Sequence, residues 1–309
     1  MPLTLVEAMK LNRGETVRNA IIALYAMNSD ILRVLPFTNI PGNAYRYNQE
    51  DTLPGVGFRG LNEGYTEDVG AINPETEHLV IAGGDLDVDK FIIDTMGNEQ
   101  RSTREAMKVK ALSHKFGQVF IKGDSTTTNK EFDGLQTRLT GSQKIAAGST
   151  SGGDALSLAK LDELIDSVDD PSHLLMSKAM RRRLTAAARD TTVGGYITYE
   201  KDAFGRKVTQ YNDLPILLSD RNGSAYPTLD FDEANPGGGS AVGTSIYALE
   251  LGEGKLSGIQ NGTMDVRDLG ELESKPVFRT RVEWYVSMLL EHARAAGRLW
   301  GIKNAAVTA

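Results

Sequence analysis

The chain has 309 residues, of which 40% are hydrophobic, and this content is ordinary for a packed globular protein of one large or two modest domains. It contains no cysteine, which excludes disulfides, thiolate zinc sites and cysteine nucleophiles and is typical of a protein made in a reducing cytosol. The net charge of −7 is the wrong sign for a broad DNA-gripping surface, and the longest apolar runs are shorter than the ~20 residues that cross a bilayer, so we expect a soluble protein without a membrane partner.

The N-terminal segment predicts two helices. Residues 4–7 have capping-box spacing, and apolar residues then recur at helical spacing over 17–34, forming one stripe that includes Leu24 and Ile31. Such a stripe needs an apolar surface to lie on. That surface belongs either to another copy of the chain, which makes Leu24 and Ile31 candidate interface residues, or to the core of the same subunit, and the sequence leaves both interpretations open.

Residues 42–82 predict an extended two-stranded arm with an irregular tip. The flanks 44–47 and 78–81 alternate like strands, and the segment between them is rich in glycine and proline. An isolated two-stranded arm is marginal in water. At ~3.3 Å per residue each limb could reach on the order of 50 Å, beyond the radius of a domain of this size. The arm therefore implies a partner, most simply another copy of the chain.

The arm contains a glycine motif that we interpret structurally. Gly55, Gly57 and Gly60 match the spacing of a dinucleotide-binding fingerprint, but that fingerprint requires a strand that turns directly into a helix. Pro54 and residues 61–65 disfavour this context, so we expect the glycines to shape the tip. The candidate inter-subunit residues of the arm are Arg46, Gly55, Gly57, Phe58, Arg59, Glu67 and Asp68.

A strand, a turn and a long helix are expected after the arm. Asp85, Asp87 and Asp89 have the spacing that opens a calcium loop, but the later glycine and glutamate ligands of that loop are missing. We therefore predict an edge strand that leads into a helix capped by Asp89. Apolar spacing over 98–120 predicts a long spine helix of roughly 33 Å, with much of its circumference solvated.

The region 131–272 predicts an inserted α/β unit, because strand patterns alternate with helix patterns. We expect a flexible connector over 141–153 and, after it, the following elements: helices over 158–168 and 177–189, strands over 173–176, 214–218 and 245–251, and a hairpin that turns at Asn261-Gly262. The basic run Arg181 to Arg183 is interpreted as a solvated helix face. The acids Asp230, Asp232 and Glu233 are interpreted as a solvated loop.

The last segment, 276–302, opens with strand alternation and predicts one long strand that packs against the spine helix. No catalytic constellation is found along the chain. The four histidines are scattered without metal-ligand spacing, at positions 78, 114, 173 and 292. The sequence therefore predicts neither an enzyme nor a cofactor or metal site.

The order of these elements resembles that of tailed-phage major capsid proteins of the Hong Kong 97 type. The resemblance is carried by residues 83–89 before the spine, 132–135 after it, 213–217 in the inserted unit, and 277–279 in the closing strand. It implies an α+β fold divided into an N-terminal helical arm over 1–41, an extended loop (E-loop) over 42–82, a peripheral P-domain with the spine helix over 83–130, an axial A-domain over 131–272 and a P-domain closing strand over 273–309.

The same resemblance implies a structural function. Copies of the chain would form pentamers and hexamers of an icosahedral shell around double-stranded DNA, with portal and scaffolding proteins as partners, and would end up in the virion after assembly in the bacterial cytoplasm. An encapsulin shell uses the same fold and is the alternative. A dinucleotide-binding enzyme, which rests on the glycine motif alone, is the alternative of a different class.

The chain departs from the family in two respects. Some members join neighbours through a lysine of the extended loop, but no lysine occurs from residue 11 to 89, so we expect no such crosslink. The arm is acidic instead, and we hypothesise that its acids pair with basic residues of a neighbour such as Arg101 or Arg104. The early start of the helical arm leaves no room for a large fused scaffold, which would then be separate, cleaved off or unnecessary.

Overall fold

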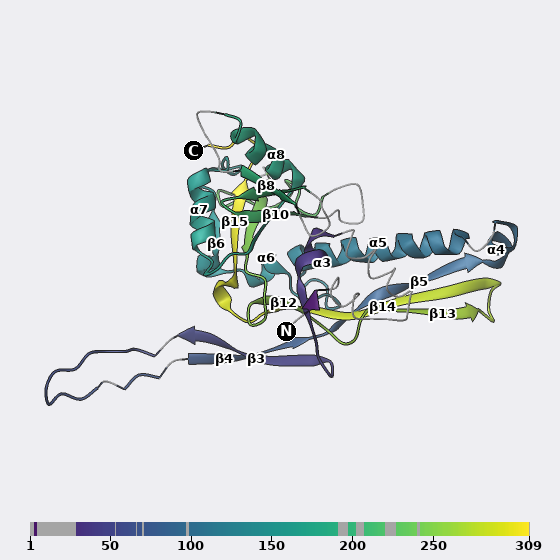
Figure 1. Cartoon of the computed structure of the whole chain (residues 1–309), viewed down its shortest axis with the longest axis horizontal. Helices are drawn as coiled ribbons and strands as arrows, with labels where there is room; N and C mark the ends of the chain where they lie inside the picture. The colour runs from purple at the N-terminus through teal and green to yellow at the C-terminus, as the bar shows by residue number, and fades with distance from the viewer. Residues whose placement is uncertain are drawn as a thin grey trace.

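The computed structural model describes residues 3–4, 29–52, 54–65, 67–69, 71–96, 99–190, 197–201, 207–219, 227–239 and 242–308. Three parts are visible in Figure 1: a unit of mixed helices and strands that carries α7 and α8, a long layer formed by α5, β5, β13 and β14, and a thin arm of β3 and β4 that projects away from both. Most of the two predicted N-terminal helices, Leu24 included, lies outside the described residues.

Two short N-terminal elements are described. Leu3–Thr4 form strand β1, which pairs with β2 (Pro36–Asn39). Helix α3 (Asp30–Val34) begins after Ser29, which has an extended backbone and accepts a hydrogen bond from the backbone N–H of Leu32 at 3.4 Å. The predicted helix over 17–34 is confirmed only for Asp30–Val34 and does not continue through Ser29, because an N-cap residue lies outside helical geometry; residues 17–28 lie outside the described residues.

The long layer consists of a helix laid on an antiparallel sheet. The predicted spine helix is confirmed as α5 (Glu99–Lys122), preceded by α4 (Lys90–Met96). The sheet order is β1, β2, β12, β14, β13, and β5 (Val80–Asp89) pairs with β14 (Val277–Leu290) on its other side. The core between helix and sheet is aromatic: Trp284 lies 5.3 Å from Phe37 and 5.2 Å from Phe116, between ring centroids. The predicted packing of the spine helix on the closing strand is confirmed.

The prediction for the aspartates at 85, 87 and 89 is also confirmed. They lie on β5, which is hydrogen-bonded to β14 along one side, and among the described residues no strand pairs with its other side. The strand runs directly into α4, where the Oδ1 atom of Asp89 accepts a hydrogen bond from the backbone N–H of Phe91 at 2.8 Å. Asp89 therefore caps the helix as predicted.

The predicted hairpin at Asn261-Gly262 is wrong. The chain does turn there, with Gly262 at φ +71°, but β12 (Leu256–Gln260) and β13 (Asp265–Glu271) do not pair with each other. Strand β12 pairs with residues 286–290 of β14, and β13 pairs with residues 278–283 of the same strand. The two strands therefore lie end to end along the side of β14 that does not pair with β5. These two strands, expected in the inserted unit over 131–272, therefore belong to the sheet of the spine helix.

The second sheet has seven strands in the order β6, β15, β11, β7, β10, β9, β8. Their bounds are β6 Lys144–Ala146, β7 His173–Met176, β8 Ile197–Lys201, β9 Lys207–Tyr211, β10 Leu214–Leu218, β11 Thr244–Leu249 and β15 Ala296–Ile302. The predicted helices are confirmed as α7 (Leu158–Asp166) and α8 (Lys178–Ala187). Ile246 and Ala248 of β11 pack with these helices, while Tyr247 and Leu249 face the core of the spine layer. This confirms an α/β unit.

Two expectations for this unit need correction. The predicted strand over 276–302 is divided by residues 291–295 into β14 and β15, which lie in different sheets, so the chain end returns to the α/β unit. The segment 141–153, expected as a flexible connector, contains a 3-10 turn (Gly141–Gln143) and strand β6, which pairs in parallel with β15. In both cases the structure of the segment depends on pairing with a strand that is distant in the sequence.

A buried histidine makes the stability of this unit depend on pH. Burial lowers the pKa of His173 from 6.5 to about 4, and the nearby charge of Arg33 acts in the same direction. Between these two pH values the unfolded chain binds a proton that the folded chain excludes, so the free energy of unfolding falls as the pH falls, by up to ~3 kcal/mol. Denaturant unfolding between pH 4 and 7 should show this loss, and His173→Gln should reduce it. An equal pH slope in the variant would contradict the assignment.

Candidate inter-subunit surface

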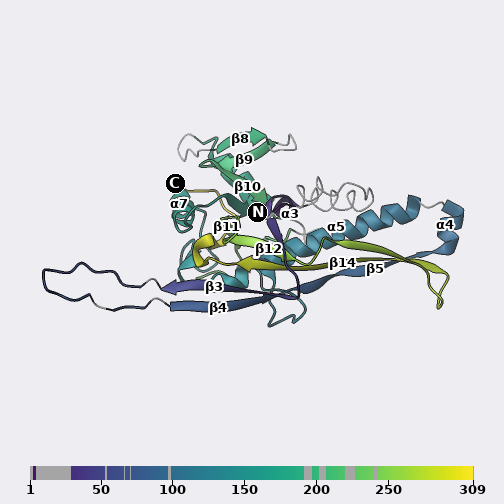
Figure 2. The same cartoon turned by 60° about the horizontal axis from the view of Figure 1, so that its bottom comes forward.

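The predicted two-stranded arm is confirmed. Strand β3 (Ala44–Thr52) pairs antiparallel with β4 (Ala71–His78), from Ala44 opposite His78 out to Thr52 opposite Ala71. Figures 1 and 2 show the arm projecting beyond the rest of the molecule. Among the described residues no third strand joins this sheet.

The root of the arm is attached to the body by apolar and ionic contacts. Tyr45 and Tyr47 stack at 6.4 Å between ring centroids and pack on a small apolar cluster with Ile40, Ile259 and Leu289. Glu77 of β4 forms an ion pair with Arg138 of α6 (Leu135–Arg138). Burial, followed by the charge of Glu77, raises the pKa of Tyr47 to about 12. The direction in which the arm leaves the body is therefore defined within the subunit.

The tip of the arm is exposed and apolar. Its exposed large side chains are Val56, Phe58, Leu61, Tyr65 and Val69. The fractional exposure of Phe58 is 109%, so this ring contacts almost nothing in its own chain. Five large apolar side chains that face solvent within one short segment favour an interaction site.

The tip nevertheless has a defined internal geometry. The backbone N–H of Gly55 donates to the Asp68 carboxylate at 2.7 Å, and that of Gly60 donates to the Glu63 carboxylate at 2.8 Å. The Arg59 guanidinium donates to the carbonyl of Glu63 at 3.1 Å. A Cβ atom at Gly55 would lie 2.6 Å from the Asp68 carboxylate, so a larger residue there would displace this side chain. No helix follows the motif in residues 61–65, so the context of a dinucleotide site is missing.

The other candidate interface residues differ in how exposed they are in the structure. Arg46 and Glu67 are exposed on the arm, and Gly57 has open space around it. Ile31 is 2% exposed and lies in the core of its own subunit, which is the core-packing interpretation that the sequence left open. Arg104 is half-buried on α5.

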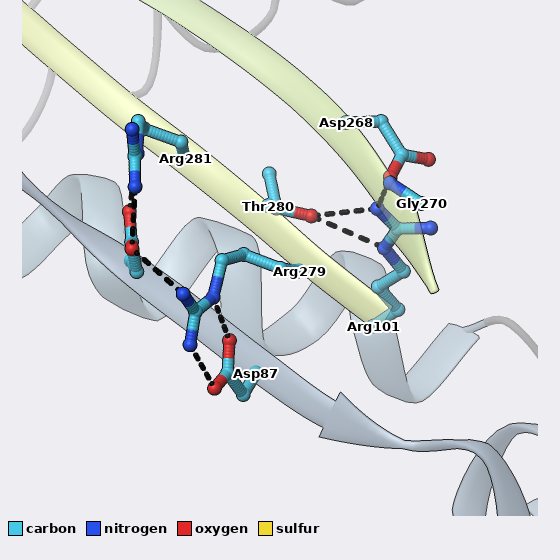
Figure 3. A network of polar contacts seen from close by, with 8 residues as sticks. Asp87, Arg101, Asp268, Gly270, Arg279, Thr280 and Arg281 are labelled. Atoms are coloured by element: carbon cyan, nitrogen blue, oxygen red, sulfur yellow. Dashed lines mark hydrogen bonds and ion pairs between the residues drawn. The ribbon is translucent and has the colours of Figure 1, made fainter. Parts of the chain in front are cut away.

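The hypothesis that Arg101 pairs with the acidic arm of a neighbour needs revision. Its guanidinium lies 2.6 Å from the Asp268 carboxylate and 3.2 Å from that of Glu105, and it also donates to the Thr280 hydroxyl at 2.7 Å (Figure 3). The charge of Arg101 is thus neutralised inside the subunit. Asp268 lies 167 positions further along the chain, and only the folded sheet brings the two together.

A second feature was not found by sequence reasoning: a ladder of ion pairs between β5 and β14. Arg279 donates to both oxygens of Asp87 at 2.6 and 2.7 Å, and Arg281 donates to both oxygens of Asp85 at 2.7 and 2.9 Å (Figure 3). Hydrogen bonds from these arginines lower the pKa of both aspartates. The period-two spacing of acids in one strand and arginines in the other was a signal that could have revealed the ladder.

A buried ionic cluster links the seven-stranded sheet to helix α6. The Glu233 carboxylate accepts hydrogen bonds from Arg298 of β15 at 3.0 Å, from Gln136 of α6 at 2.6 Å and from Ser245 of β11. Glu233 is 7% exposed, so its interpretation as a member of a solvated loop is wrong. Asp232 of the same loop forms an ion pair with Lys122 at the end of α5 at 2.7 Å, so the loop contacts the α/β unit and the spine helix.

The described residues contain no group of three or more His, Asp or Glu side chains that could hold a metal ion. Among the helices in the described part of the chain, none is long and apolar enough to cross a membrane. The exposed arm is therefore the feature on which an interpretation of function rests.

Comparisons with known structures identify the fold. The encapsulin SrpI of Synechococcus elongatus PCC 7942, in its holo complex, is 18% identical, with a TM-score of 0.64 over 100% of this chain and 99% of the other. The capsid of an empty GTA particle is 13% identical, with a TM-score of 0.60 over 89% and 90% of the two chains. A structure from Mycobacterium phage Adephagia is 14% identical, with a TM-score of 0.61 over 88% and 89%. No protein-family model matches the chain, and no curated protein matches it.

These similarities define an α+β fold of the class found in protein shells. The chain has the Hong Kong 97-like fold, as the resemblance in sequence order implied. The similarity covers the arm, the spine layer and the α/β unit together, since it extends over nearly the whole of both chains.

Proposed function

We propose that the chain is a major capsid (head) protein that self-assembles into pentamers and hexamers of an icosahedral shell around double-stranded phage DNA. The exposed apolar tip, with Phe58 at 109% exposure, is the observation that carries this proposal, because such a surface is stable in water only when another molecule covers it. Similarity to several capsid structures over almost the whole chain supports it.

The proposal assigns parts of the shell to parts of the chain. The spine layer would form the P-domain, the α/β unit the A-domain near the centre of each capsomer, and the arm the E-loop that covers a neighbour. The chain would have no catalytic role. Portal and scaffolding proteins would be its further partners, and the virion its final location after assembly in the host cytoplasm. The net charge of −7 would let packaged DNA slide past the wall without adhering.

An encapsulin-like compartment is the second candidate. The similarity to the SrpI encapsulin supports it, since it extends over 100% of this chain with a TM-score of 0.64. The two candidates share the shell and differ in its contents, which are DNA in one case and a protein cargo in the other.

Expression of the chain, size-exclusion chromatography and negative-stain microscopy test both candidates. We expect uniform hollow particles in either case. Particles that co-purify with nuclease-protected DNA when phage packaging proteins are present support the capsid, and particles that enclose a host protein without DNA support the compartment. A compact monomer under all concentrations and salt conditions would contradict both.

A further inference from the structure

The two helices that cover one face of the seven-stranded sheet have opposite charges. Helix α7 buries Leu161, Leu164 and Ile165, and its solvent side is acidic except for Lys160, which forms an ion pair with Glu163 at 2.6 Å. The stretch 162–170 contains five acids and no lysine or arginine. These acids are all exposed, and they are Asp162, Glu163, Asp166, Asp169 and Asp170.

Helix α8 has the reverse character. It buries Met180 and Leu184 against the same face of the sheet. The stretch 178–189 contains five cations and no acid. The most exposed of them share the side opposite the buried residues, and they are Lys178, Arg182 and Arg189.

Two charges of each set have no counter-charge within the described subunit. In the part of the chain that the structure describes, Lys178 and Arg182 have no ion-pair partner within 4.0 Å, and neither do Asp166 and Asp170. The other acids of α7 are satisfied locally, for example Asp162 by the Tyr211 hydroxyl at 2.9 Å. A subunit that leaves charges of opposite sign unpaired on two separate surfaces has two patches that complement each other but not themselves.

The positions of the patches are compatible with a ring. Figure 1 shows α7 along one edge of the α/β unit and α8 along another. A contact between the acidic edge of one copy and the basic edge of the next can be repeated head to tail, and it closes into a ring when the rotation allows it. Pentamers and hexamers are rings of this kind.

We propose that the acidic face of α7 in one subunit docks on the basic face of α8 in the next subunit around each capsomer. This inference rests on the proposed function and names the partner surface within it. Nucleic acid is the other polyanion that α8 could bind. The acidic face of a second copy is favoured because every subunit carries one acidic and one basic face, so the two faces occur in equal number.

A charge-swap experiment tests the contact. Lys178→Glu with Arg182→Glu reverses the basic face, and Asp166→Lys with Asp170→Lys reverses the acidic face. Each pair should weaken capsomer association about tenfold or more at low ionic strength, because like charges then oppose each other. The four substitutions together should restore association to within about threefold, because the pairing is re-formed with reversed sign. Mass photometry and sedimentation velocity measure association, and thermal melting by circular dichroism verifies that the exposed substitutions preserve the fold.

A matched control has the same change of net charge on another surface. Lys110→Glu with Lys130→Glu alters two exposed lysines, one on α5 and one in the loop after it. Addition of Asp166→Lys and Asp170→Lys should not rescue any effect of this control pair.

If the unmodified chain forms shells but the variant with all four α7 and α8 substitutions does not regain association, the α7 to α8 contact is wrong and the proposed function stands. If the α8 reversal lowers DNA content and leaves association unchanged, α8 is a nucleic-acid surface and the proposal is overturned. If the unmodified chain never oligomerises, that result contradicts both the proposed function and this contact.

Discussion

Replacement of residues 53–70 by an Asn-Gly turn is expected to abolish shell assembly and leave the subunit folded. Strands β3 and β4 pair out to Thr52 and Ala71, so a two-residue turn closes the hairpin without a change of register. The root contacts, including the ion pair of Glu77 with Arg138, remain in place. The deletion removes every exposed apolar side chain of the tip. Negative-stain microscopy and size-exclusion chromatography should show capsomers or monomers in place of shells.

A pair of single substitutions makes this test specific. Phe58→Ser removes one exposed aromatic ring from the tip, and Tyr199→Ser removes one from the α/β unit, where it is 51% exposed. We expect the first to reduce the yield of shells several-fold and the second to leave it unchanged. Thermal melting of all three variants should match that of the unmodified chain. Shells of normal size and yield from the tip-deleted chain would show that the arm does not hold neighbours together.

Arg298→Met is expected to destabilise the subunit by ~3–5 kcal/mol, because it removes the hydrogen-bonded counter-charge of the buried Glu233 carboxylate and leaves only the more distant Lys122 ammonium, 4.0 Å away in the described structure. The two side chains lie 3.0 Å apart, and the residues are 6% and 7% exposed. A second substitution, Glu233→Gln, removes the uncompensated charge, and the double variant should recover part of the loss. Urea unfolding at neutral pH measures all three free energies.

The matched control is Arg279→Met, which breaks an ion pair that has ideal two-point geometry and lies on the surface of the β5 and β14 ladder. Water replaces the lost partner there, so the loss should be clearly smaller. A loss for Arg298→Met no larger than that for Arg279→Met would refute the importance of the buried cluster. Full recovery in the double variant would show that the cluster contributes no net stability beyond avoiding an unpaired charge.

Most of the local structure could be predicted from short-range signals. The spine helix, both helices of the α/β unit and the cap at Asp89 follow from apolar spacing and capping residues a few positions apart. The arm follows from two alternating flanks around a segment rich in glycine and proline. Each of these depends on a handful of neighbouring residues, and the sequence displays them directly.

The errors share a different origin. One continuous strand was expected over 276–302, but its two halves pair with different sheets, and alternation alone does not reveal a change of partner. Glu233 lies in a loop of ordinary surface composition and meets Arg298, 65 positions further along the chain, only because β11 to β14 fold between them. For the interface residues, the sequence indicated that Ile31 and Arg101 needed partners without showing that these lie in the same subunit.

By itself the sequence determined that this chain has an arm it cannot cover and a solvated spine helix, because these properties reside in residue types and their local spacing. Only the tertiary structure decided which strands share a sheet, which charges are neutralised inside the subunit and which remain for a neighbour. Those outcomes depend on pairing between distant segments, where a shift of one residue exchanges the buried and exposed faces of a strand.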